Sequence, residues 1–497
     1  MSPKDISEEA AVARELSQIA KLDANELKDL FSQKNKRYVQ LKKDLSDEEI
    51  KAVGEAKKDG RLPKLGVWLE AETRRYYPEG EFLSHTMGFV GLSTDNKTGL
   101  YGLEKYFDEE LAGTPGSLNA SADPGGRVIA GSFRKLIPAV NGSTLVLTVD
   151  RAIQVQAEKV LKDYVQKFGA EGGSVIVANP KTGAILAIAS EPAFNPNEYN
   201  KVKDILVFGN PSVQARYEPG SIIKPLTMAA ALDSGQIKPD DTYKDTGQTV
   251  IGSHVIQNSD LKSYGVQTMT EVLEKSLNTG IVYVQQQIGK ETLGEYFRKF
   301  GLGEKTGITL PGEVAGDLRN MATKSDIALA TAAFGQGISA TPLEIVQAYT
   351  AIASNGEMKK LHIVSEIHHS EGTREVVEPQ VVRRVLSEAT AAKLGSMMVN
   401  VVENGHGKRA GVKGYYIAGK TGTAQVPSKD ERGYDPDKSI GSFIGFGPVE
   451  NPAFVMLTKI DNPKGVKFAE STAAPAFGEI AKFILDYLQV PPTRTLE

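Results

Sequence analysis

The N-terminal third of the chain shows two successive patterns of apolar and polar residues. Residues 5–60 are charged, and their apolar positions predict helices over 7–20, 24–32 and 46–58. From 62 to about 149 the apolar runs become short and are broken by glycine, as in HTMGFVGLS and PGGRVIAGSF. These patterns predict a helical appendage followed by an irregular domain that contains β-strands.

The rest of the chain has longer apolar segments. RAIQVQAEKVLKDYVQKFG carries apolar residues at helical spacing, and a new domain is expected to start near residue 150. GSVIVANPKTGAILAIAS predicts two strands joined by a turn at 179–183, whose Lys-Thr-Gly we interpret as an ordinary turn. Downstream, GYYIAGKTGTAQV, SIGSFIGFGPV and PAFVMLTKID predict three more strands, followed by a helix over about 471–488. Because about 220 mostly helical residues separate the strand groups, we expect an α+β fold with a five-stranded antiparallel sheet flanked by helices.

The stretch RYEPGSIIKPLTMAAALDSG predicts a buried helix that begins near Ser221 and is closed by Gly235. Pro225 fits this start, because the first N–H groups of a helix have no intrahelical partner and proline lacks that donor. Residues three apart share a helix face, so Ser221 and Lys224 are predicted to be neighbours.

Two further short stretches complete a set. Ser276-Leu277-Asn278 lies 55 residues after Ser221, between a helix opened by the capping box Thr268-x-x-Glu271 and a helix expected to run to Gly289. Lys420-Thr421-Gly422-Thr423 follows on a predicted strand. Ser-x-x-Lys, Ser-x-Asn and Lys-Thr-Gly in this order are the signature of penicillin-binding proteins and class A β-lactamases. Each stretch alone carries little information, and the prediction depends on their order and context.

These residue types suit acyl transfer to a serine. A hydroxyl is a weak nucleophile until a base removes its proton, and a lysine can be that base if its pKa falls towards neutrality. Burial, a helix N-terminus and the second cation at Lys420 would all lower the pKa of Lys224. We therefore assign catalytic roles to Ser221 as nucleophile, Lys224 as general base and Ser276 as proton relay, while Asn278 is expected to bind a substrate amide.

The strand motif is expected to bind substrate. Its glycines let a strand edge approach a ligand closely, so Lys420, Thr421, Gly422 and Thr423 are predicted substrate-binding residues. The backbone N–H groups of Ser221 and Thr423 are predicted to form an oxyanion hole, which is typically worth roughly 3–4 kcal/mol per donor.

Composition narrows the function classes further. The chain has 58 basic and 62 acidic side chains, so its net charge of −4 gives no reason to expect a nucleic-acid partner. It has no cysteine, which excludes disulfides and thiol catalysis, and histidines such as His368 and His369 lack metal-ligand spacing. We therefore expect no metal and no cofactor. The start MSPKDISEEAAVAREL shows no signal peptide, and no run of 18 apolar residues is present, which suggests a soluble portion excised from a longer protein.

The chain resembles the class B penicillin-binding proteins. YEPGSIIKP, LEKSLNTG, AFGQGISATPLEIVQAYTAIASNG and IAGKTGTAQVP are similar to the transpeptidase domain of that class. RRYYPEGEFLSHTMGFVG and GLYGLEKYFDEELAGTPG are similar to its elongated pedestal domain, so the resemblance covers roughly 60–490. It implies a pedestal with its appendage over 1–149, a transpeptidase domain of the penicillin-binding and β-lactamase type over 150–490, and a tail over 491–497.

The resemblance implies a D,D-transpeptidase that cross-links peptidoglycan. Ser221 would attack the D-Ala-D-Ala terminus of a stem peptide, release D-alanine and pass the acyl group to an amine of a neighbouring strand. β-Lactams would acylate the same serine. The family also implies a transmembrane anchor, a place on the extracytoplasmic face of the bacterial membrane, and a SEDS glycosyltransferase with other cell-wall synthesis proteins as partners.

Several alternatives stay open from the sequence. Within the class, the pedestal favours the septal over the elongation type. A class A β-lactamase would need a carboxylate for deacylation, and PGEVAGDLRN offers Glu313, but not in the Glu-x-x-Leu-Asn arrangement of those enzymes. A β-lactam sensor would share the motifs without the pedestal. The chain also has Gly405-His406-Gly407 where many relatives have Gly-Thr-Gly, and we give His406 no catalytic role.

Overall fold

A computed structural model describes most of the chain, and its residues divide into two compact units, Met1–Tyr76 and Tyr77–Glu497. No helix within the described ranges combines the length and the apolar character that crossing a membrane requires. The described residues are 1–43, 45–72, 74–93, 96–121, 129, 134–323, 325–428, 433–466 and 468–495.

The first unit is built from three helices around its own small core. Helices α1 (Glu9–Ala20), α2 (Ala24–Ser32) and α3 (Asp47–Lys58) confirm the three predicted segments to within two residues. Leu16 and Phe31 are among the apolar side chains that these helices bury against one another. A serine–glutamate capping box opens α3, as its sequence favours.

Residues 77–149 combine short helices with paired strands, as the broken apolar pattern predicted. Strands β1 and β2 form one antiparallel hairpin, and β3 and β4 form another. Strand β5 instead pairs with β13 (Val364–His368), which also pairs with β14 (Arg374–Val376). The elements before residue 149 are α4 (Ser84–Met87), β1 (Val90–Ser93), β2 (Asn96–Gly99), α5 (Gly102–Tyr106), α6 (Asp108–Ala112), β3 (Ser117–Ala120), β4 (Arg134–Ile137) and β5 (Thr144–Leu147). The predicted domain boundary near residue 150 stays a prediction.

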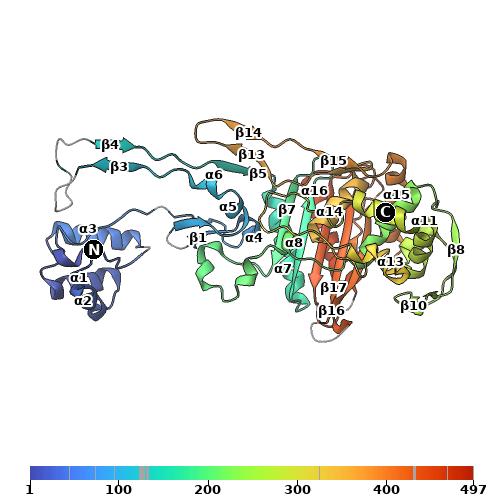
Figure 1. Cartoon of the computed structure of the whole chain (residues 1–497), viewed down its shortest axis with the longest axis horizontal. Coiled ribbons are helices and arrows are strands. Elements are labelled where there is room, and N and C mark those ends of the chain that lie inside the picture. The colour runs from blue at the N-terminus through green and yellow to red at the C-terminus, as the bar shows by residue number, and fades with distance from the viewer. Residues whose placement is uncertain are drawn as a thin grey trace. The chain divides into compact units, whose positions relative to one another are not determined.

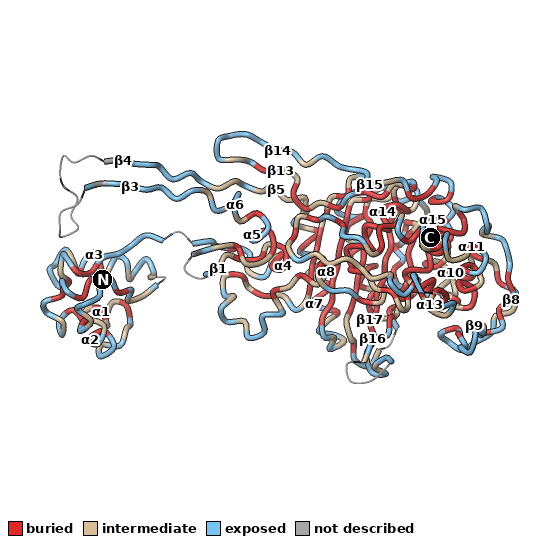
Figure 2. Tube along the Cα trace, viewed as in Figure 1, coloured by how far each residue is buried: buried red, intermediate tan, exposed pale blue. Residues whose placement is uncertain are grey.

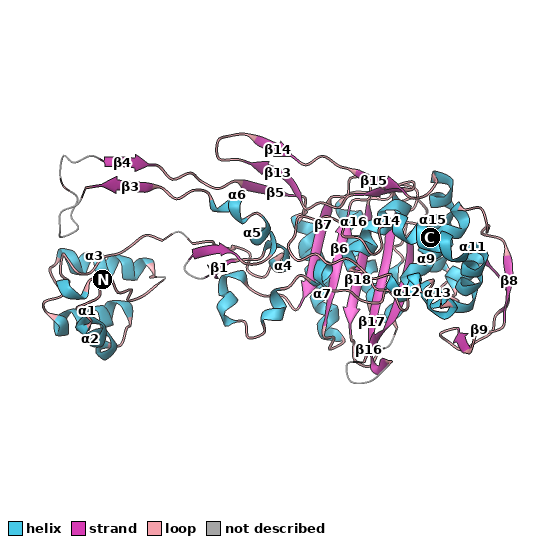
Figure 3. Ribbon diagram, viewed as in Figure 1, coloured by secondary structure: helices cyan, strands magenta, loops and turns pink. Residues whose placement is uncertain are grey.

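The central sheet of the second unit confirms the five-stranded antiparallel prediction (Figure 3). The strand order is β16-β17-β18-β6-β7, so β16, which carries the Lys-Thr-Gly motif, lies at an edge of the sheet. The turn between β6 and β7 is the predicted ordinary turn, closed by a hydrogen bond from the Gly183 N–H to the Asn179 carbonyl (2.8 Å). The five strands are β6 (Gly172–Ala178), β7 (Ile185–Glu191), β16 (Ala418–Pro427), β17 (Tyr434–Gly447) and β18 (Phe454–Asp461).

Both faces of this sheet are buried under helices (Figures 1 and 2). Along β6, Val175 and Val177 join the core formed with helices α7 and α16. Ile176 and Ala178 point the other way and join the core formed with α9, α11, α14 and α15. These helices are α7 (Arg151–Lys167), α9 (Lys224–Asp233), α11 (Asn278–Lys299), α14 (Pro342–Ala353), α15 (Glu388–Glu403) and α16 (Ala473–Tyr487). The resulting layers, helix–sheet–helix, hold the edge strand β16 beside the helical region.

The region between the two strand groups is less uniformly helical than predicted. In the described part of this region eight short strands, β8 to β15, interrupt the helices, and each has only three to five residues, so no long apolar run in the sequence indicates them. The helix expected to end at Gly289 does lose helical geometry there (φ 75°, ψ 176°), but a helical segment resumes and continues to Lys299. The remaining elements are α8 (Pro211–Gln214), β8 (Thr242–Asp245), β9 (Gln248–Ile251), β10 (His254–Gln257), β11 (Gly265–Thr268), α10 (Met269–Glu274), α12 (Arg319–Ala322), α13 (Asp326–Ala332), β12 (Glu357–Lys359) and β15 (Val381–Arg384).

Candidate active site

Ser221 lies in a tight turn that leads into a buried helix. The turn, η4 (Gly220–Ile223), has 3-10 geometry, and the α-helix α9 begins at Lys224 rather than at Ser221. Side chains three residues apart eclipse one another in a 3-10 turn, so this difference keeps Ser221 and Lys224 on the same side. Pro225 occupies the first turn of α9, and Gly235 follows its end in the left-handed region (φ 73°), as predicted.

Residues that the sequence did not single out hold this turn in place. The Gly220 N–H donates to the Gly335 carbonyl (3.0 Å), and the Tyr349 hydroxyl donates to the Ile222 carbonyl (2.6 Å). Any side chain at Gly335 would collide with the Gly220 carbonyl, because a Cβ there would lie 2.1 Å from that oxygen. The AFGQG stretch that contains Gly335 was visible in the sequence as part of the family resemblance, but nothing in it indicated this contact.

The edge strand β16 packs directly against the serine turn. A Cβ at Gly422 would lie 2.9 Å from the Pro219 carbonyl oxygen and 2.9 Å from the Ile222 side chain. A Cβ at Gly220 would lie 3.2 Å from the Thr423 carbonyl oxygen. Glycine therefore permits the approach that brings the Lys-Thr-Gly-Thr stretch beside Ser221, as predicted from the two motifs.

Ser276 occupies an unusual backbone position. The predicted capping box of Thr268 and Glu271 opens α10, and Ser276 follows the end of this helix with φ 56°. The Ser276 N–H donates to the Leu273 carbonyl (3.2 Å), and the next N–H, that of Leu277, donates to the Val272 carbonyl (2.9 Å). This is the Schellman arrangement, in which glycine is the usual residue at the left-handed position. A serine there carries backbone strain, which is typical of functional sites.

Two buried amines meet at the Ser276 hydroxyl. Lys420 Nζ donates to Ser276 Oγ at 2.9 Å, and Lys224 Nζ approaches the same oxygen at 3.2 Å. Lys224 Nζ also donates to the Ser276 carbonyl (2.6 Å) and to Asn278 Oδ1 (2.7 Å). Both lysines are fully buried, whereas Ser221, Ser276 and Asn278 are partly exposed. The structure thus brings residues from all three motifs together.

The environment lowers the pKa of both amines. Burial, followed by the positive charge of Lys420, holds the pKa of Lys224 well below its ordinary value of 10.5. Burial alone lowers the pKa of Lys420 to about 7. A lysine with a lowered pKa can be neutral near physiological pH, which is the form that accepts a proton.

The other residues of the third motif border the same place. Lys420 Nζ also donates to the Thr421 carbonyl (3.1 Å), and Thr421 is buried. Thr423 is partly exposed, and its hydroxyl accepts a hydrogen bond from the Ala469 N–H (3.2 Å). Because it accepts one bond, that hydroxyl retains its proton for donation to a ligand.

His406 and Glu313 form polar contacts with other residues. His406 pairs with Glu470 through Nδ1 (2.9 Å), and its lack of a catalytic role stays a prediction. The Glu313 carboxylate accepts hydrogen bonds from the N–H and hydroxyl of Thr306 (2.7 and 2.5 Å) and from the Gly307 N–H (3.1 Å). Glu313 therefore stabilises its own loop.

Comparison with known proteins agrees with this geometry. Residues 173–482 match the family model "Penicillin binding protein transpeptidase domain", and residues 1–147 match "Penicillin-binding Protein dimerisation domain". Stage V sporulation protein D of Bacillus subtilis is 36% identical over 469 residues, which cover 92% of this chain and 72% of that protein. Peptidoglycan D,D-transpeptidase FtsI of Buchnera aphidicola is 32% identical over 484 residues, which cover 96% of this chain and 80% of that protein.

Solved structures give the same result. Penicillin binding protein 3 from Mycobacterium tuberculosis in complex with ampicillin matches with a TM-score of 0.74 and 32% identity, over 85% of this chain and 92% of that chain. The predicted fold and the predicted class of serine-type transpeptidase are thereby confirmed. The chain belongs to the class B penicillin-binding proteins, in which a penicillin-binding transpeptidase domain follows a dimerisation domain.

Proposed function

We propose that this chain is a peptidoglycan D,D-transpeptidase in which Ser221 carries the acyl group. The observation that supports the proposal most directly is the pair of buried amines, Lys224 and Lys420, that meet at Ser276 Oγ beside the serine turn. Acyl transfer requires a base for the serine proton, a path for that proton to the leaving group, and donors for the developing oxyanion. Each requirement has a candidate among the residues of the three motifs.

Lys224 serves as the general base. A neutral amine has two N–H donors and one lone pair, and the two short contacts of Lys224, to the Ser276 carbonyl (2.6 Å) and to Asn278 Oδ1 (2.7 Å), use both donors. The lone pair is then left for the proton of Ser221, which lies three residues earlier on the same side of the turn. Asn278 thus orients the base in addition to its predicted contact with a substrate amide.

Ser276 serves as the proton relay. Its oxygen accepts a hydrogen bond from Lys420 Nζ (2.9 Å), so the hydroxyl proton is left for donation to a third group. The leaving amine of the substrate is that group in the proposed reaction. Lys420 compensates the negative charge that develops on Ser276 Oγ as its proton departs.

Backbone groups of the serine turn and of strand β16 are the proposed binding partners of the developing oxyanion and of the stem peptide. The Ser221 N–H lies at the start of a helical turn, where N–H groups have no intrahelical partner, and the Thr423 N–H belongs to the strand that packs against this turn. Strand β16 lies at the sheet edge, so an extended stem peptide can bind along it, with Thr421, Gly422 and Thr423 as its contacts.

The reaction is balanced in two steps. Ser221 Oγ adds to the carbonyl carbon of the penultimate D-alanine, and its proton passes to Lys224. The bond to the terminal D-alanine then breaks as Ser276 protonates the leaving nitrogen and Lys224 returns its extra proton to Ser276. An amine of a neighbouring stem peptide then attacks the ester, and the proton it loses returns to Ser221 through the same residues. A β-lactam reacts in the same way as the substrate in the first step: Ser221 Oγ attacks the carbonyl carbon of the ring, the ring opens, and an ester remains on Ser221.

The proposed cellular role rests on the similarity of this chain to its relatives. Their names include FtsI and stage V sporulation protein D, which favours the septal type over the elongation type. Solved relatives hold ampicillin and aztreonam, which supports inhibition by β-lactams. The proposal includes the partners and the place that the family implies: stem peptides as substrates, a SEDS glycosyltransferase among the partners, and anchoring at the extracytoplasmic face of the membrane.

Mass spectrometry of the protein after benzylpenicillin treatment tests this proposal. We expect one covalent adduct, located by peptide mapping on Ser221, and release of D-alanine from a peptide ending in D-Ala-D-Ala when an acceptor amine is supplied. Ser221→Ala should form no adduct while keeping the melting temperature of the wild type. An adduct on another residue, or undiminished labelling of Ser221→Ala, would refute the assignment.

A rapid loss of the adduct would instead indicate a β-lactamase. The structure favours the transpeptidase, because the carboxylate offered by the sequence for deacylation, Glu313, is bound to Thr306 and Gly307. The match to a dimerisation domain over residues 1–147 likewise argues against a stand-alone sensor. The lifetime of the adduct, measured after removal of free benzylpenicillin, separates these alternatives.

A further inference from the structure

A buried carboxylate lies beside the Ser-Leu-Asn motif and has no role in the mechanism above. Asp245 ends strand β8, and its side chain is 1% exposed. Its oxygens accept hydrogen bonds from the Gly247 N–H (3.0 Å), the Tyr264 N–H (2.8 Å), the Asn258 side-chain amide (3.1 and 3.2 Å) and the Thr279 hydroxyl (2.8 Å). Among the described ion pairs, none involves Asp245. A buried charge without a cation is costly unless donors surround it, so this arrangement requires an explanation.

Two of these donors belong to a path that ends at the catalytic lysine. Asp245 accepts from the Asn258 amide nitrogen, so Asn258 Oδ1 is turned towards the start of α11. There it accepts from the Thr279 N–H (3.3 Å) and lies 3.0 Å from the Thr279 hydroxyl oxygen. Asp245 and Asn258 therefore hold Thr279, which is the residue directly after Asn278, from two sides.

The same segment fixes the side chain of Asn278. Asn278 Nδ2 donates to the carbonyl of Gln257 (2.9 Å), the neighbour of Asn258 in the chain. Because the nitrogen of this amide is engaged there, its oxygen must face the other way, where it accepts from Lys224 Nζ (2.7 Å). The orientation of one amide thus depends on the position of residues 257 and 258, which Asp245 holds.

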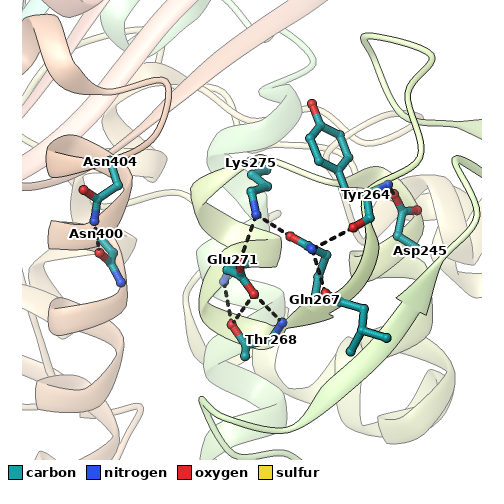
Figure 4. A network of polar contacts seen from close by, with 9 residues as sticks. Asp245, Tyr264, Gln267, Thr268, Glu271, Lys275, Asn400 and Asn404 are labelled. Carbon is teal, nitrogen blue, oxygen red and sulfur yellow. Dashed lines mark hydrogen bonds and ion pairs between the residues drawn. The ribbon is translucent and has the colours of Figure 1, made fainter.

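Figure 4 shows that the same segment also contacts the residue before the motif. Lys275 Nζ binds Glu271 Oε1 (2.9 Å) and Gln267 Oε1, and Gln267 donates to the carbonyl of Tyr264 (2.9 Å). Tyr264 is in turn held through its N–H by Asp245. Segment 242–268 therefore reaches the Ser-Leu-Asn motif on both flanks, at Lys275 and at Thr279.

We infer that Asp245 is a positioning residue for acylation: through Asn258 and Thr279 it keeps the Asn278 amide oriented with its oxygen on Lys224. A misplaced Asn278 would present its NH₂ group to the amine, where two donors would face each other. The base would then lose the acceptor that orients it, and a displacement of about 1 Å in such a constellation can cost about a hundredfold in rate. This inference rests on the proposed role of Lys224 in acylation of Ser221.

The test uses three substitutions in the whole chain and follows acylation by a fluorescent penicillin. Thr279→Val keeps the shape of the side chain but removes the hydroxyl that binds Asp245, and we expect acylation about tenfold slower. Thr279→Ser keeps the hydroxyl, and its rate should lie within about twofold of the wild type. Asp245→Asn places an amide NH₂ against other donors and should slow acylation by about 10- to 100-fold.

If Asp245 only stabilised the fold, the acylation rate would fall in proportion to the melting temperature in every variant. A control variant tests this alternative. Thr458→Val removes a buried hydroxyl on β18 that donates to the Ala473 carbonyl (2.8 Å) at the start of α16, and it leaves the path from Asp245 to Asn278 intact. It should lower the melting temperature without changing the acylation rate. In Thr279→Val and Asp245→Asn, the acid limb of the rate–pH profile should also move to lower pH, because loss of an acceptor disfavours the protonated amine. Lys420, the other titratable group that faces Lys224, is unchanged in every variant.

Two results would overturn the inference. One is acylation at the wild-type rate in Thr279→Val. The other is a loss of rate that follows melting temperature across all variants, Thr458→Val included, with an unchanged pH profile. Failure of the wild type itself to form an adduct would instead refute the proposed function, and this inference with it. Since Thr279→Val removes one hydroxyl only, it provides the test even if Asp245→Asn does not fold.

Discussion

Lys420 Nζ lies 2.9 Å from the hydroxyl oxygen of Ser276, although the two residues are 144 positions apart in the chain. Lys420 comes from the edge strand β16, and Ser276 follows the short helix α10, so the contact joins the sheet to the helical region. A second amine lies near the same oxygen, because Lys224 Nζ approaches Ser276 Oγ at 3.2 Å. Because the Ser276 hydroxyl lies between two buried amines, we expect acylation to depend on the charge of the lysines, on the backbone at Ser276 and on the packing of β16. Substitutions can test these three dependences separately.

Replacing Lys420 by methionine should stabilise the protein at neutral and acidic pH. The folded-state pKa of Lys420 is about 7, against 10.5 in the unfolded chain, because burial disfavours the ammonium. Between these two values the unfolded state binds a proton that the folded state does not, so the stability of the wild type rises with pH across this window. Below pH 7 the cost of burying the charge is fully present, on the order of 5 kcal/mol before the lost hydrogen bonds of Lys420 are subtracted.

Urea denaturation of Lys420→Met and wild type between pH 6 and pH 10 measures this difference. We expect the stability advantage of the variant to be largest near pH 6 and to shrink as the pH rises towards 10, while acylation is lost. Lys482→Met, which removes an exposed lysine paired with Asp486, is the control for the change in net charge. A pH-independent difference between Lys420→Met and wild type would contradict the lowered pKa.

Replacing Lys224 by arginine separates the role of base from the role of cation. Arginine keeps the positive charge, but its guanidinium does not give up a proton at working pH. If Lys224 acts as the base, the second-order rate constant for acylation by benzylpenicillin should fall at least about a thousandfold, as far as in Lys224→Ala. Because Lys224 is buried, either substitution could destabilise the fold, so the melting temperature of each variant must be measured as well. Substantial acylation by a folded Lys224→Arg protein would show that charge alone suffices and would remove Lys224 as the base.

Ser276 should show a conflict between stability and activity. With φ 56° it takes the left-handed position that closes α10, a conformation that costs a residue with a side chain about 1 kcal/mol relative to glycine. Ser276→Gly and Ser276→Ala both delete the hydroxyl and should both lose acylation by about 100-fold or more. Of the two, Ser276→Gly should be more stable to urea by about 1 kcal/mol. Equal stability of the two variants would mean that the backbone at residue 276 is not strained.

Much of this site was predictable from the sequence because its chemistry is local. Ser221 and Lys224 are three residues apart, Ser276 and Asn278 two, and a glycine in a strand motif indicates a close approach wherever the strand lies. Most strands of the sheet were also predictable, since both faces are buried and β6, β7 and β18 each contain an apolar run. The pattern of residues therefore located the polar side chains that the structure brings together and the sheet that holds them.

What the sequence did not reveal depends on contacts between distant segments. Nothing near Gly335 indicates that its neighbour in space is Gly220, and nothing near Asp245 indicates that its donors include Thr279, 34 residues later. Strand β8, which presents Asp245, has four residues and exposes two of them, so it leaves no periodic signal long enough to detect. The helix beyond Gly289 was missed for a related reason, since a glycine with φ 75° ends one helical segment without preventing another from starting.

Gly422→Ala should separate the serine turn from the strand beside it. A Cβ at this position would lie 2.7 Å from Ser442 Oγ and 2.9 Å from both the Pro219 carbonyl oxygen and the Ile222 side chain. Since the Pro219 oxygen belongs to the backbone, the turn that carries Ser221 must shift away from β16. We expect the acylation rate constant to fall about 10- to 100-fold, through displacement of Ser221 from the Thr423 N–H.

The matched control for this substitution is Gly54→Ala in helix α3, where an added Cβ meets nothing within 4 Å. Alanine is the better helix former by about 1 kcal/mol, so the control should be slightly more stable and should acylate at the wild-type rate. Stopped-flow measurements with a fluorescent penicillin give the rate constant for each variant. If Gly422→Ala acylated as fast as Gly54→Ala, the close packing of β16 on the serine turn would not set the geometry of acylation, and the oxyanion hole would have to be formed by other donors.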